Sequence, residues 1–262
     1  GGPLVDDAAG ACKGFVCRYH GWSYALDGAL QHARDFGADV PAQDLALAPV
    51  RAETWRGLVF VNFDADAPPL IDWLGGFADE CAAYPMESFV AGVRSSHPIE
   101  ANWKVYAENY QEGYHIPLVH PGLNRQIDAR KYDVDVRDGY CVHSAATRDG
   151  SVTAGAWLWK FPSLALNIYP EGMCVETYAP AGAGSTRVDY AFFFAEGTPD
   201  EEIRATIASS DAILDEDRTI CEAVQRNMAS GVYTPGPLSP RHEGGVAEVQ
   251  RRGLAALDGR RE

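Results

Sequence analysis

Two histidines and an acidic residue lie close together in one segment of the chain. His115 and His120 are five residues apart, and Glu112 precedes His115 by three, on the same helical face. Imidazole nitrogens are common ligands of transition metals, so this segment is a candidate metal site. On a regular helix, residues five apart point about 140° away from each other. Pro117 lies between the histidines and predicts that the helix ends or deforms there, which lets both imidazoles reach one ion.

A third candidate ligand, Asp217, belongs to a long helix expected at residues 199–230. Asp217 falls within an apolar stripe at three-and-four spacing, so we expect it on a buried face. A buried carboxylate costs several kcal/mol unless a cation accompanies it. Two imidazoles and one carboxylate on one side of an ion form the arrangement of non-haem Fe(II) oxygenases. The stripe comprises Ile203, Ile207, Ser210, Leu214, Cys221, Val224 and Met228.

Other interpretations of these residues stay open. The two histidines can be unrelated residues near a helix end, and Asp217 can pair with Lys104 or an arginine instead of a metal. The charged neighbours of Asp217 lie off the apolar stripe and are expected on a solvated face; they are Asp211, Asp215, Glu216 and Arg218.

A second candidate metal-binding segment lies near the start of the chain. Cys17 and His20 are three residues apart on an expected tight loop, and Gly21 permits the backbone to turn closely there. Such a pair supplies half of a four-ligand site, and Cys12 and His32 have the wrong spacing to complete it. A buried thiol beside an unrelated histidine is the alternative.

Composition limits the class of protein that can carry these segments. The chain has 262 residues, 46% hydrophobic and 11% aromatic, which is enough for a sizeable core and excludes disordered and fibrous classes. With 22 Lys and Arg against 37 Asp and Glu, the formal net charge of −15 disfavours nucleic acid and anionic membranes as partners. No apolar run approaches the roughly 18 residues of a membrane-spanning helix. Six scattered cysteines in so long a chain predict a reducing, cytoplasmic location.

The elements that must position the candidate ligands follow from runs of apolar residues and turn formers. Residues 12–65 are expected to be small antiparallel β-structure, with a hairpin at Asp27-Gly28. Prolines within residues 64–69 predict a domain boundary there. Beyond it, helices are expected at 70–84, 102–112 and 199–230, and strands at 140–145, 156–161, 165–168, 174–178 and 187–194. Strands grouped between flanking helices predict an α+β fold.

Taken together, these segments resemble the catalytic (alpha) subunit of Rieske-type non-haem iron oxygenases, the ring-hydroxylating dioxygenase family. Cys17 and His20, within F-V-C-R-Y-H-G-W-S-Y, resemble the second Cys/His pair of the family's [2Fe-2S] site. Residues 1–4 (G-G-P-L) resemble the turn that follows its first pair. The sequence is therefore expected to be N-terminally truncated, with half a cluster site. The segment from Glu216 to Arg226 resembles the choline monooxygenase and betaine-demethylase branch.

The resemblance implies a partial Rieske β domain at residues 1–66 and a helix-grip (START-like) catalytic domain at residues 67–262, with an antiparallel sheet and a long C-terminal helix. It implies that His115, His120 and Asp217 ligate a mononuclear Fe(II), and that Glu112 conducts electrons between domains. The implied reaction is mono- or dioxygenation, which inserts oxygen from O₂ into a small organic substrate, either an aromatic ring or an N-methyl or quaternary amine.

The resemblance also implies partners. A ferredoxin or flavin reductase would deliver electrons from NAD(P)H, and the family's typical homotrimer places the cluster of one subunit near the iron of the next. The aromatic residues Trp157, Trp159, Phe161 and Tyr178 can form a cage for the substrate or belong to the core. Two rival functions are a non-catalytic helix-grip protein that binds an apolar ligand and an iron–sulfur electron carrier or zinc module.

Overall fold

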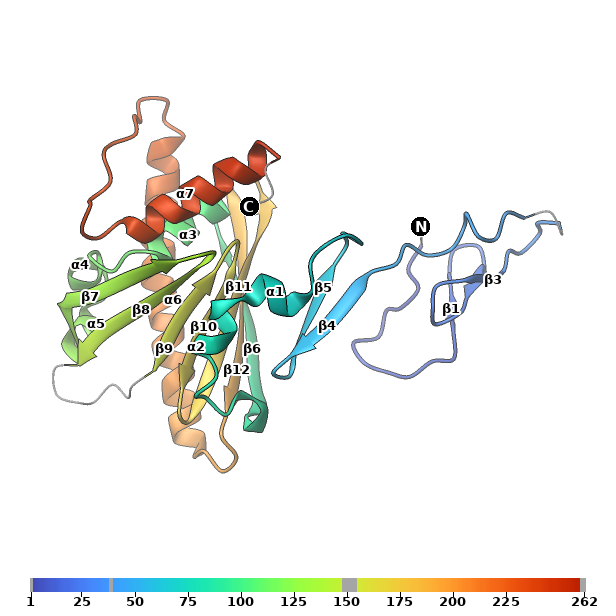
Figure 1. Ribbon diagram of the computed structural model, residues 1–262, viewed down its shortest axis with the longest axis horizontal. Helices are drawn as coiled ribbons and strands as arrows, with labels where there is room; N and C mark the ends of the chain where they lie inside the picture. The colour runs from blue at the N-terminus through green and yellow to red at the C-terminus, as the bar shows by residue number, and fades with distance from the viewer. Residues whose placement is uncertain (1, 38–39, 148–154, 260–262) are drawn as a thin grey trace. The chain divides into compact units, whose positions relative to one another are not determined.

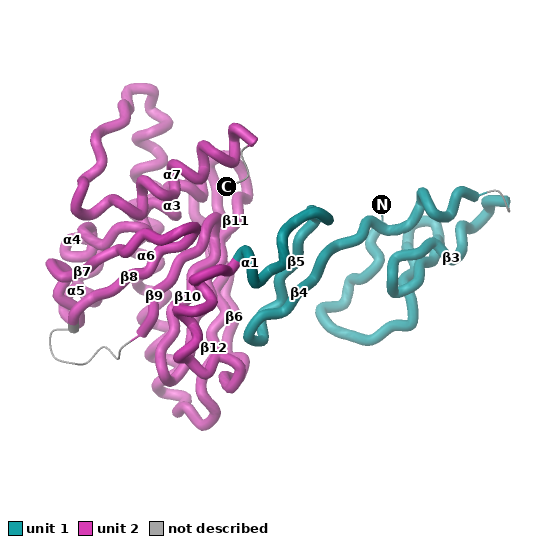
Figure 2. The backbone as a smooth tube through the Cα atoms, in the orientation of Figure 1, with its two compact units in different colours: residues 1–73 teal, residues 74–262 magenta. Residues whose placement is uncertain are grey.

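The computed structural model describes residues 2–37, 40–147 and 155–259. The chain forms two compact units, Gly1–Trp73 and Leu74–Glu262 (Figure 2). The division falls after Trp73, whereas the sequence predicts a domain boundary after residue 66. Gly1, part of the turn expected at residues 1–4, lies outside the described residues.

The first unit contains two small antiparallel sheets. One consists of β1 (Phe15–Val16), β2 (Ser23–Tyr24) and β3 (Leu30–His32), and the other of β4 (Arg51–Trp55) and β5 (Leu58–Asn62). The hairpin predicted at Asp27-Gly28 is confirmed, because β2 pairs with β3 around these residues. Gly28 has a φ of 90°, a conformation that glycine adopts without strain.

A seven-stranded antiparallel sheet dominates the second unit, with the strand order β6-β12-β11-β10-β9-β8-β7 (Figure 1). Its strands are β6 (Val90–Ile99), β7 (Ile127–Arg137), β8 (Tyr140–Thr147), β9 (Ala156–Lys160), β10 (Leu164–Tyr169), β11 (Gly172–Gly182) and β12 (Ser185–Phe194). The five predicted strands correspond to β8–β12. The sequence missed β6 and β7, which are the two edge strands and have many exposed positions, so neither contains a continuous apolar run.

The helices of the second unit include one very long one, α6 (Asp200–Met228), which passes behind the sheet in Figure 1. The helix predicted at residues 199–230 is thus confirmed, as is the α+β class. The others are α2 (Gly76–Glu80), the 3₁₀ turn η1 (Met86–Ser88), α3 (Trp103–Tyr110), α4 (Ile116–Val119), α5 (Pro121–Gln126) and α7 (Gly244–Leu257). No helix in the described part of the chain is long and apolar enough to cross a bilayer.

One helix prediction was wrong, and one helix was not predicted. The single helix expected at residues 70–84 is divided into α1 (Leu70–Leu74) and α2 by Gly75, whose φ of 52° does not continue a helix, and α2 ends at Glu80. The sequence did not predict α7, which begins with two glycines and contains a third, a residue that weakens helix propensity.

The core of the second unit lies between the sheet and α3, α6 and α7. Sheet residues such as Trp159, Tyr178 and Phe192 pack there with Tyr106 of α3 and Leu214 of α6. These contacts fix the rotation of α3 and α6 about their axes and therefore decide which of their polar side chains face each other.

Candidate metal centre

Two breaks in helical structure position His115 and His120. His115 directly precedes α4, and His120 separates α4 from α5 with φ −115° and ψ 73°. The predicted break in the helix between the imidazoles is confirmed, but Pro117 does not cause it. Pro117 lies in the first turn of α4, where a missing amide hydrogen costs little. Pro121 is the cause, because a residue that precedes proline is disfavoured in the helical conformation.

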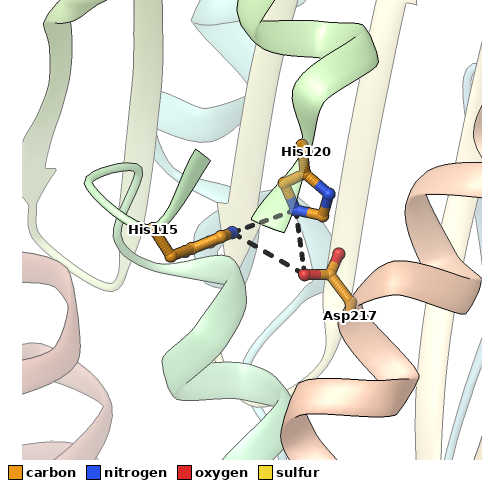
Figure 3. A group of neighbouring side chains, drawn as sticks. All are labelled: His115, His120 and Asp217. Atoms are coloured by element: carbon orange, nitrogen blue, oxygen red, sulfur yellow. Dashed lines mark hydrogen bonds and ion pairs between the residues drawn. The ribbon is translucent and has the colours of Figure 1, made fainter. Parts of the chain in front are cut away.

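The structure brings His115, His120 and Asp217 together, with one possible ligand atom of each within 4.8 Å of the others (Figure 3). The Nε2 atoms of the two histidines are 3.1 Å apart. The nearer carboxylate oxygen of Asp217, Oδ1, lies 3.0 Å from Nε2 of His120 and 3.7 Å from Nε2 of His115. Three atoms at about these separations can share one ion with bond lengths of about 2.0–2.2 Å.

Asp217 lies on the buried face of α6, as its place in the apolar stripe predicts, and is 9% exposed. Within the described ranges, no lysine or arginine pairs with it. Lys104 instead donates to Asn102 Oδ1 at 2.8 Å. Asn109, which was not predicted from the sequence, donates from Nδ2 to Asp217 Oδ1 at 2.7 Å. No local pattern marks Asn109, since this contact depends on how α3 packs against α6.

Each imidazole has a carboxylate at its other nitrogen. His115 Nδ1 contacts Glu112 Oε1, and Glu112 Oε2 accepts the backbone N–H of Tyr114 at 2.8 Å. His120 Nδ1 lies 2.8 Å from Oε2 of Glu216. An Nδ1–H that donates to a carboxylate leaves Nε2 with a free lone pair, which is the form that binds a metal.

The contact of Glu216 contradicts the expectation that it belongs to a solvated face. The Glu216 side chain is 36% exposed, so it stands at the border of the buried face rather than outside it. The sequence could not show this, because His120 approaches α6 from a different part of the chain and meets the helix beside Asp217.

Opposing effects act on the pKa of His120. Burial disfavours the charged imidazole, but hydrogen bonds and charges from Asp217 and Glu216 outweigh burial and raise its pKa above the ordinary value. The same negative charge that retains a proton would favour a divalent cation at Nε2, which makes the centre chemically suited to a metal.

A cavity of about 880 Å³ adjoins the three ligand residues. It lies in the second unit, and its lining combines aromatic rings with polar side chains, five carboxylates among them. The aromatic lining residues are Tyr106, Tyr110, Tyr132, Trp157, Tyr169, Tyr190, Phe192 and Phe194. A concave, largely apolar site beside a candidate metal centre is suited to a small organic ligand.

Only one of the four aromatic cage candidates lines this cavity. Trp157 does so, whereas Trp159, Phe161 and Tyr178 do not. Trp159 and Tyr178 are almost fully buried in the core, where α3 covers them through Tyr106. Trp159, Phe161 and Tyr178 therefore belong to the core, which is one of the two alternatives that the sequence left open.

Glu176, which lines the cavity and is 2% exposed, was not predicted from the sequence. Burial, opposed by a hydrogen bond from Tyr106 and assisted by the charge of Asp217, raises its pKa to about 7. A signal was available, because Glu176 alternates with Cys174 and Tyr178 along β11 and so occupies an inward-facing position.

In the first unit, Cys17 and His20 line one small cavity of about 250 Å³. Backbone hydrogen bonds from Tyr19, and further ones from His20 and Gly2, lower the pKa of the Cys17 thiol although partial burial opposes them. Amide groups directed at the sulfur favour the thiolate, the form that binds metals. Among the residues that the structure describes, His115, His120 and Asp217 are the only group of three or more metal-ligand types, so Cys17 and His20 remain a pair.

The fold agrees with comparisons of the sequence and the structure with known proteins. The chain belongs to the ring hydroxylating alpha subunit family, whose catalytic-domain model matches residues 86–150 and 135–259. It is 27% identical over 239 residues to the chloroplastic choline monooxygenase of Beta vulgaris, covering 85% of this chain and 54% of that protein. It is 29% identical over 251 residues to the carnitine monooxygenase oxygenase subunit of Escherichia coli K12, covering 89% and 67%. The chain thus spans about half the length of the choline monooxygenases it matches.

Solved structures show the same relationship. The quaternary ammonium Rieske monooxygenase CntA in complex with L-carnitine superposes with a TM-score of 0.81 and 26% identity, covering 98% of this chain and 74% of that one. A naphthalene 1,2-dioxygenase superposes with a TM-score of 0.73 at 20% identity, covering 97% and 76%, which shows the shared fold. The resemblance to Rieske-type oxygenase alpha subunits and the helix-grip fold with its long helix are thereby confirmed.

Proposed function

We propose that this chain is the catalytic part of a Rieske-type non-haem iron oxygenase, which inserts oxygen from O₂ into a small organic substrate. The convergence of His115, His120 and Asp217 beside the large cavity carries this proposal. Its membership of the ring hydroxylating family and its oxygenase relatives support it. A cytoplasmic location is part of the proposal, and the six free cysteines are consistent with a reducing compartment.

The residues present fit a mononuclear Fe(II). Two imidazole Nε2 atoms and a carboxylate oxygen lie close enough to share one ion, and the carboxylates of Glu112 and Glu216 at the Nδ1 atoms favour the metal-binding tautomer of both imidazoles. When bound, Fe(II) would supply the reductive activation of dioxygen. A plain ligand-binding protein has no use for this set of groups.

The chain's own side chains have separable tasks in this function. Asn109 holds the Asp217 carboxylate by a hydrogen bond of 2.7 Å. Glu112 and Glu216 hold the protons of the two Nδ1 atoms and thereby orient the rings. The aromatic walls of the cavity would bind the substrate and exclude water from the reacting centre.

Glu112 is the residue we propose as the bridge for electrons from a [2Fe-2S] cluster of the neighbouring subunit in a homotrimer. Its side chain is 13% exposed and touches His115 without contributing to the three-residue metal group. Cys17 and His20 would supply two of the four cluster ligands, and a ferredoxin or flavin reductase would provide electrons from NAD(P)H. The solved relative CntA is described as having inter-subunit electron transfer, which supports this arrangement.

Metal analysis tests the proposed function. We expect the chain, loaded with Fe(II) in the absence of oxygen, to retain one iron ion in its second unit. Both His120→Ala and Asp217→Ala should lose this ion. The exposed His32, in β3 of the first unit, provides a matched control, because His32→Ala should retain this iron. If wild-type protein binds no iron, the oxygenase proposal fails and a non-catalytic ligand-binding protein replaces it.

A further inference from the structure

A buried carboxylate faces the cavity without a cationic partner. Glu176 is 2% exposed, and its Oε1 accepts a hydrogen bond of 2.7 Å from the hydroxyl of Tyr106. Throughout the residues that the structure describes, this is its single hydrogen-bond partner, and no lysine, arginine or histidine forms an ion pair with it. Burying an ionised carboxylate in this way costs several kcal/mol unless a positive charge compensates it.

The other charged groups of the cavity do not supply that positive charge. Its lining contains five carboxylates, namely Glu112, Glu171, Glu176, Glu202 and Asp217, and no lysine or arginine among the described residues. Glu112 and Asp217 have their own partners in the metal centre, and Glu171 and Glu202 are exposed. Glu176 is therefore a buried carboxyl that is neutral when protonated and that, once ionised, has no compensating cation among the described lining residues.

The surroundings of Glu176 are suited to an alkylated cation rather than to a metal. Tyr106, Tyr190 and Phe192 line the same cavity, and aromatic faces attract cations that carry apolar substituents. Burial raises the pKa of Glu176 to about 7, so a large fraction of it is ionised at neutral pH, and an adjacent cation would favour the ionised form further. A neutral arene would leave the ionised form of this carboxyl without a compensating charge.

The lack of lysine and arginine in the described lining has a second consequence. A ligand that carries its own carboxylate, such as a betaine, needs a positive group or several hydrogen-bond donors to replace its hydration. The described lining instead offers further negative charge. The cavity therefore disfavours zwitterions as well as neutral compounds.

We propose that Glu176 is a specificity-determining residue that pairs with the ammonium group of a monocationic alkylammonium substrate, and that the cavity selects such cations over zwitterionic and neutral isosteres. The inference rests on the proposed function, since it names the substrate class of the same cavity. It concerns equilibrium binding, however, and can be measured without turnover.

Three small ligands of similar shape test this selectivity. Choline is a monocation, glycine betaine is a zwitterion, and 3,3-dimethylbutan-1-ol replaces the trimethylammonium group by a neutral tert-butyl group. We expect the protein to bind choline at least tenfold more tightly than either of the others, by calorimetric titration at pH 8. Equal affinity for the neutral isostere or for betaine, or no saturable binding of choline, would overturn the proposal.

The variant Glu176→Gln assigns the selectivity to this residue, because its amide oxygen can still accept from Tyr106 while the negative charge is lost. We expect it to fold, to retain iron and to lose the tenfold preference for choline. Glu201→Gln, at an exposed position of α6 outside the lining, changes the net charge equally and should keep the preference. A preference that persists in Glu176→Gln would refute the role of Glu176. Failure of the iron-binding test above, with the choline preference intact, would instead reject only the oxygenase function.

Discussion

At the level of single residues, the carboxylates around the metal centre have two different roles. Asp217 faces the imidazole Nε2 atoms, whereas Glu112 and Glu216 contact the Nδ1 atoms on the far side of the rings. The first position provides a ligand, and the second sets the tautomer and the ring orientation. Removing the ligand should therefore weaken metal binding more than removing a carboxylate that contacts Nδ1.

Glu216→Ala should weaken Fe(II) binding by about 10- to 100-fold without abolishing it, because His120 keeps Nε2 but loses the partner of Nδ1. Anaerobic titration with Fe(II), or with Co(II) as a spectroscopic substitute, measures this change. Asp215 is the matched control, since it precedes Glu216 on α6 but pairs with Arg218 at the surface. Asp215→Asn should bind metal as the wild type does, and equal losses in both variants would contradict the assigned contact.

Glu112→Gln should leave the iron in place while slowing the delivery of electrons, because the substitution preserves shape but removes the negative charge beside His115. Single-turnover reoxidation of the reduced cluster, in the proposed trimeric assembly with substrate and oxygen, measures the rate. Unchanged transfer would make Glu112 a bystander. Loss of iron would make it essential to the centre itself, and in either case the proposed bridge would be withdrawn.

The pKa of Glu176 predicts a pH dependence of stability. The pKa of this carboxyl is raised from the ordinary value of 4.5 to about 7 in the folded state. Between these pH values the unfolded chain loses the proton while the folded chain keeps it, so stability falls as pH rises, by on the order of 3 kcal/mol in total. The stability of the Glu176→Gln variant should lack this pH-dependent component. Urea unfolding of both proteins at pH 5 and pH 8 checks it, and an equal pH effect in the two would exclude Glu176 as its source.

At the level of elements, the packing of α7 against the end of α3 supports the turn that contains Glu112. A Cβ atom added at Gly245 of α7 would lie 2.6 Å from the carbonyl oxygen of Gln111, which is fully buried. Because Gln111 directly precedes Glu112, a shift of α7 should displace the backbone of Gln111 and thereby move Glu112 at the metal centre.

Gly245→Ala should destabilise the second unit by about 1–3 kcal/mol, since the new methyl group meets backbone and α7 must shift. Thermal unfolding, together with the metal titration described above, measures both effects. Gly253 lies on the same helix with nothing within 4 Å of an added Cβ. Gly253→Ala should therefore stabilise the protein by about 0.5–1 kcal/mol through helix propensity. An unchanged stability of the Gly245→Ala variant would show that α7 is free to move.

At the scale of the whole molecule, the metal centre and the large cavity both belong to the unit Leu74–Glu262, whereas Cys17 and His20 belong to Gly1–Trp73. The two units therefore carry separate groups of candidate ligands. A metal that binds the folded centre but not the unfolded chain should stabilise only the second unit.

Fe(II) or Co(II) at 100 times its dissociation constant should stabilise the second unit by about 2.7 kcal/mol. For a unit of this size, that corresponds to a rise in melting temperature of several degrees. Differential scanning calorimetry without oxygen measures the shift, and Asp217→Ala provides the comparison because it removes one ligand. A metal-induced shift that is equally large in Asp217→Ala would place the bound metal elsewhere.

Local patterns in the sequence were sufficient for the candidate ligands and for the five inner strands of the large sheet. The spacing of Glu112, His115 and His120 and the position of Asp217 in a helical stripe each depend on residues a few positions apart. Backbone geometry translates such spacings directly into faces of a helix or strand. The same reasoning failed at the edge strands β6 and β7, where partial exposure blurs the apolar pattern.

Only the tertiary structure decided which side chains meet between distant segments. Asn109 reaches Asp217, Glu216 reaches His120, and Glu176 opens onto the cavity without a cation, through contacts between elements far apart in the chain. Each depends on the rotation of α6 about its axis and on which part of the sheet α3 covers. A rotation of one residue, 100° on a helix, would exchange the buried and exposed acids. The sequence by itself therefore determined the ligand types and their spacing, whereas packing of the core determined their surroundings and hence the charge of the cavity.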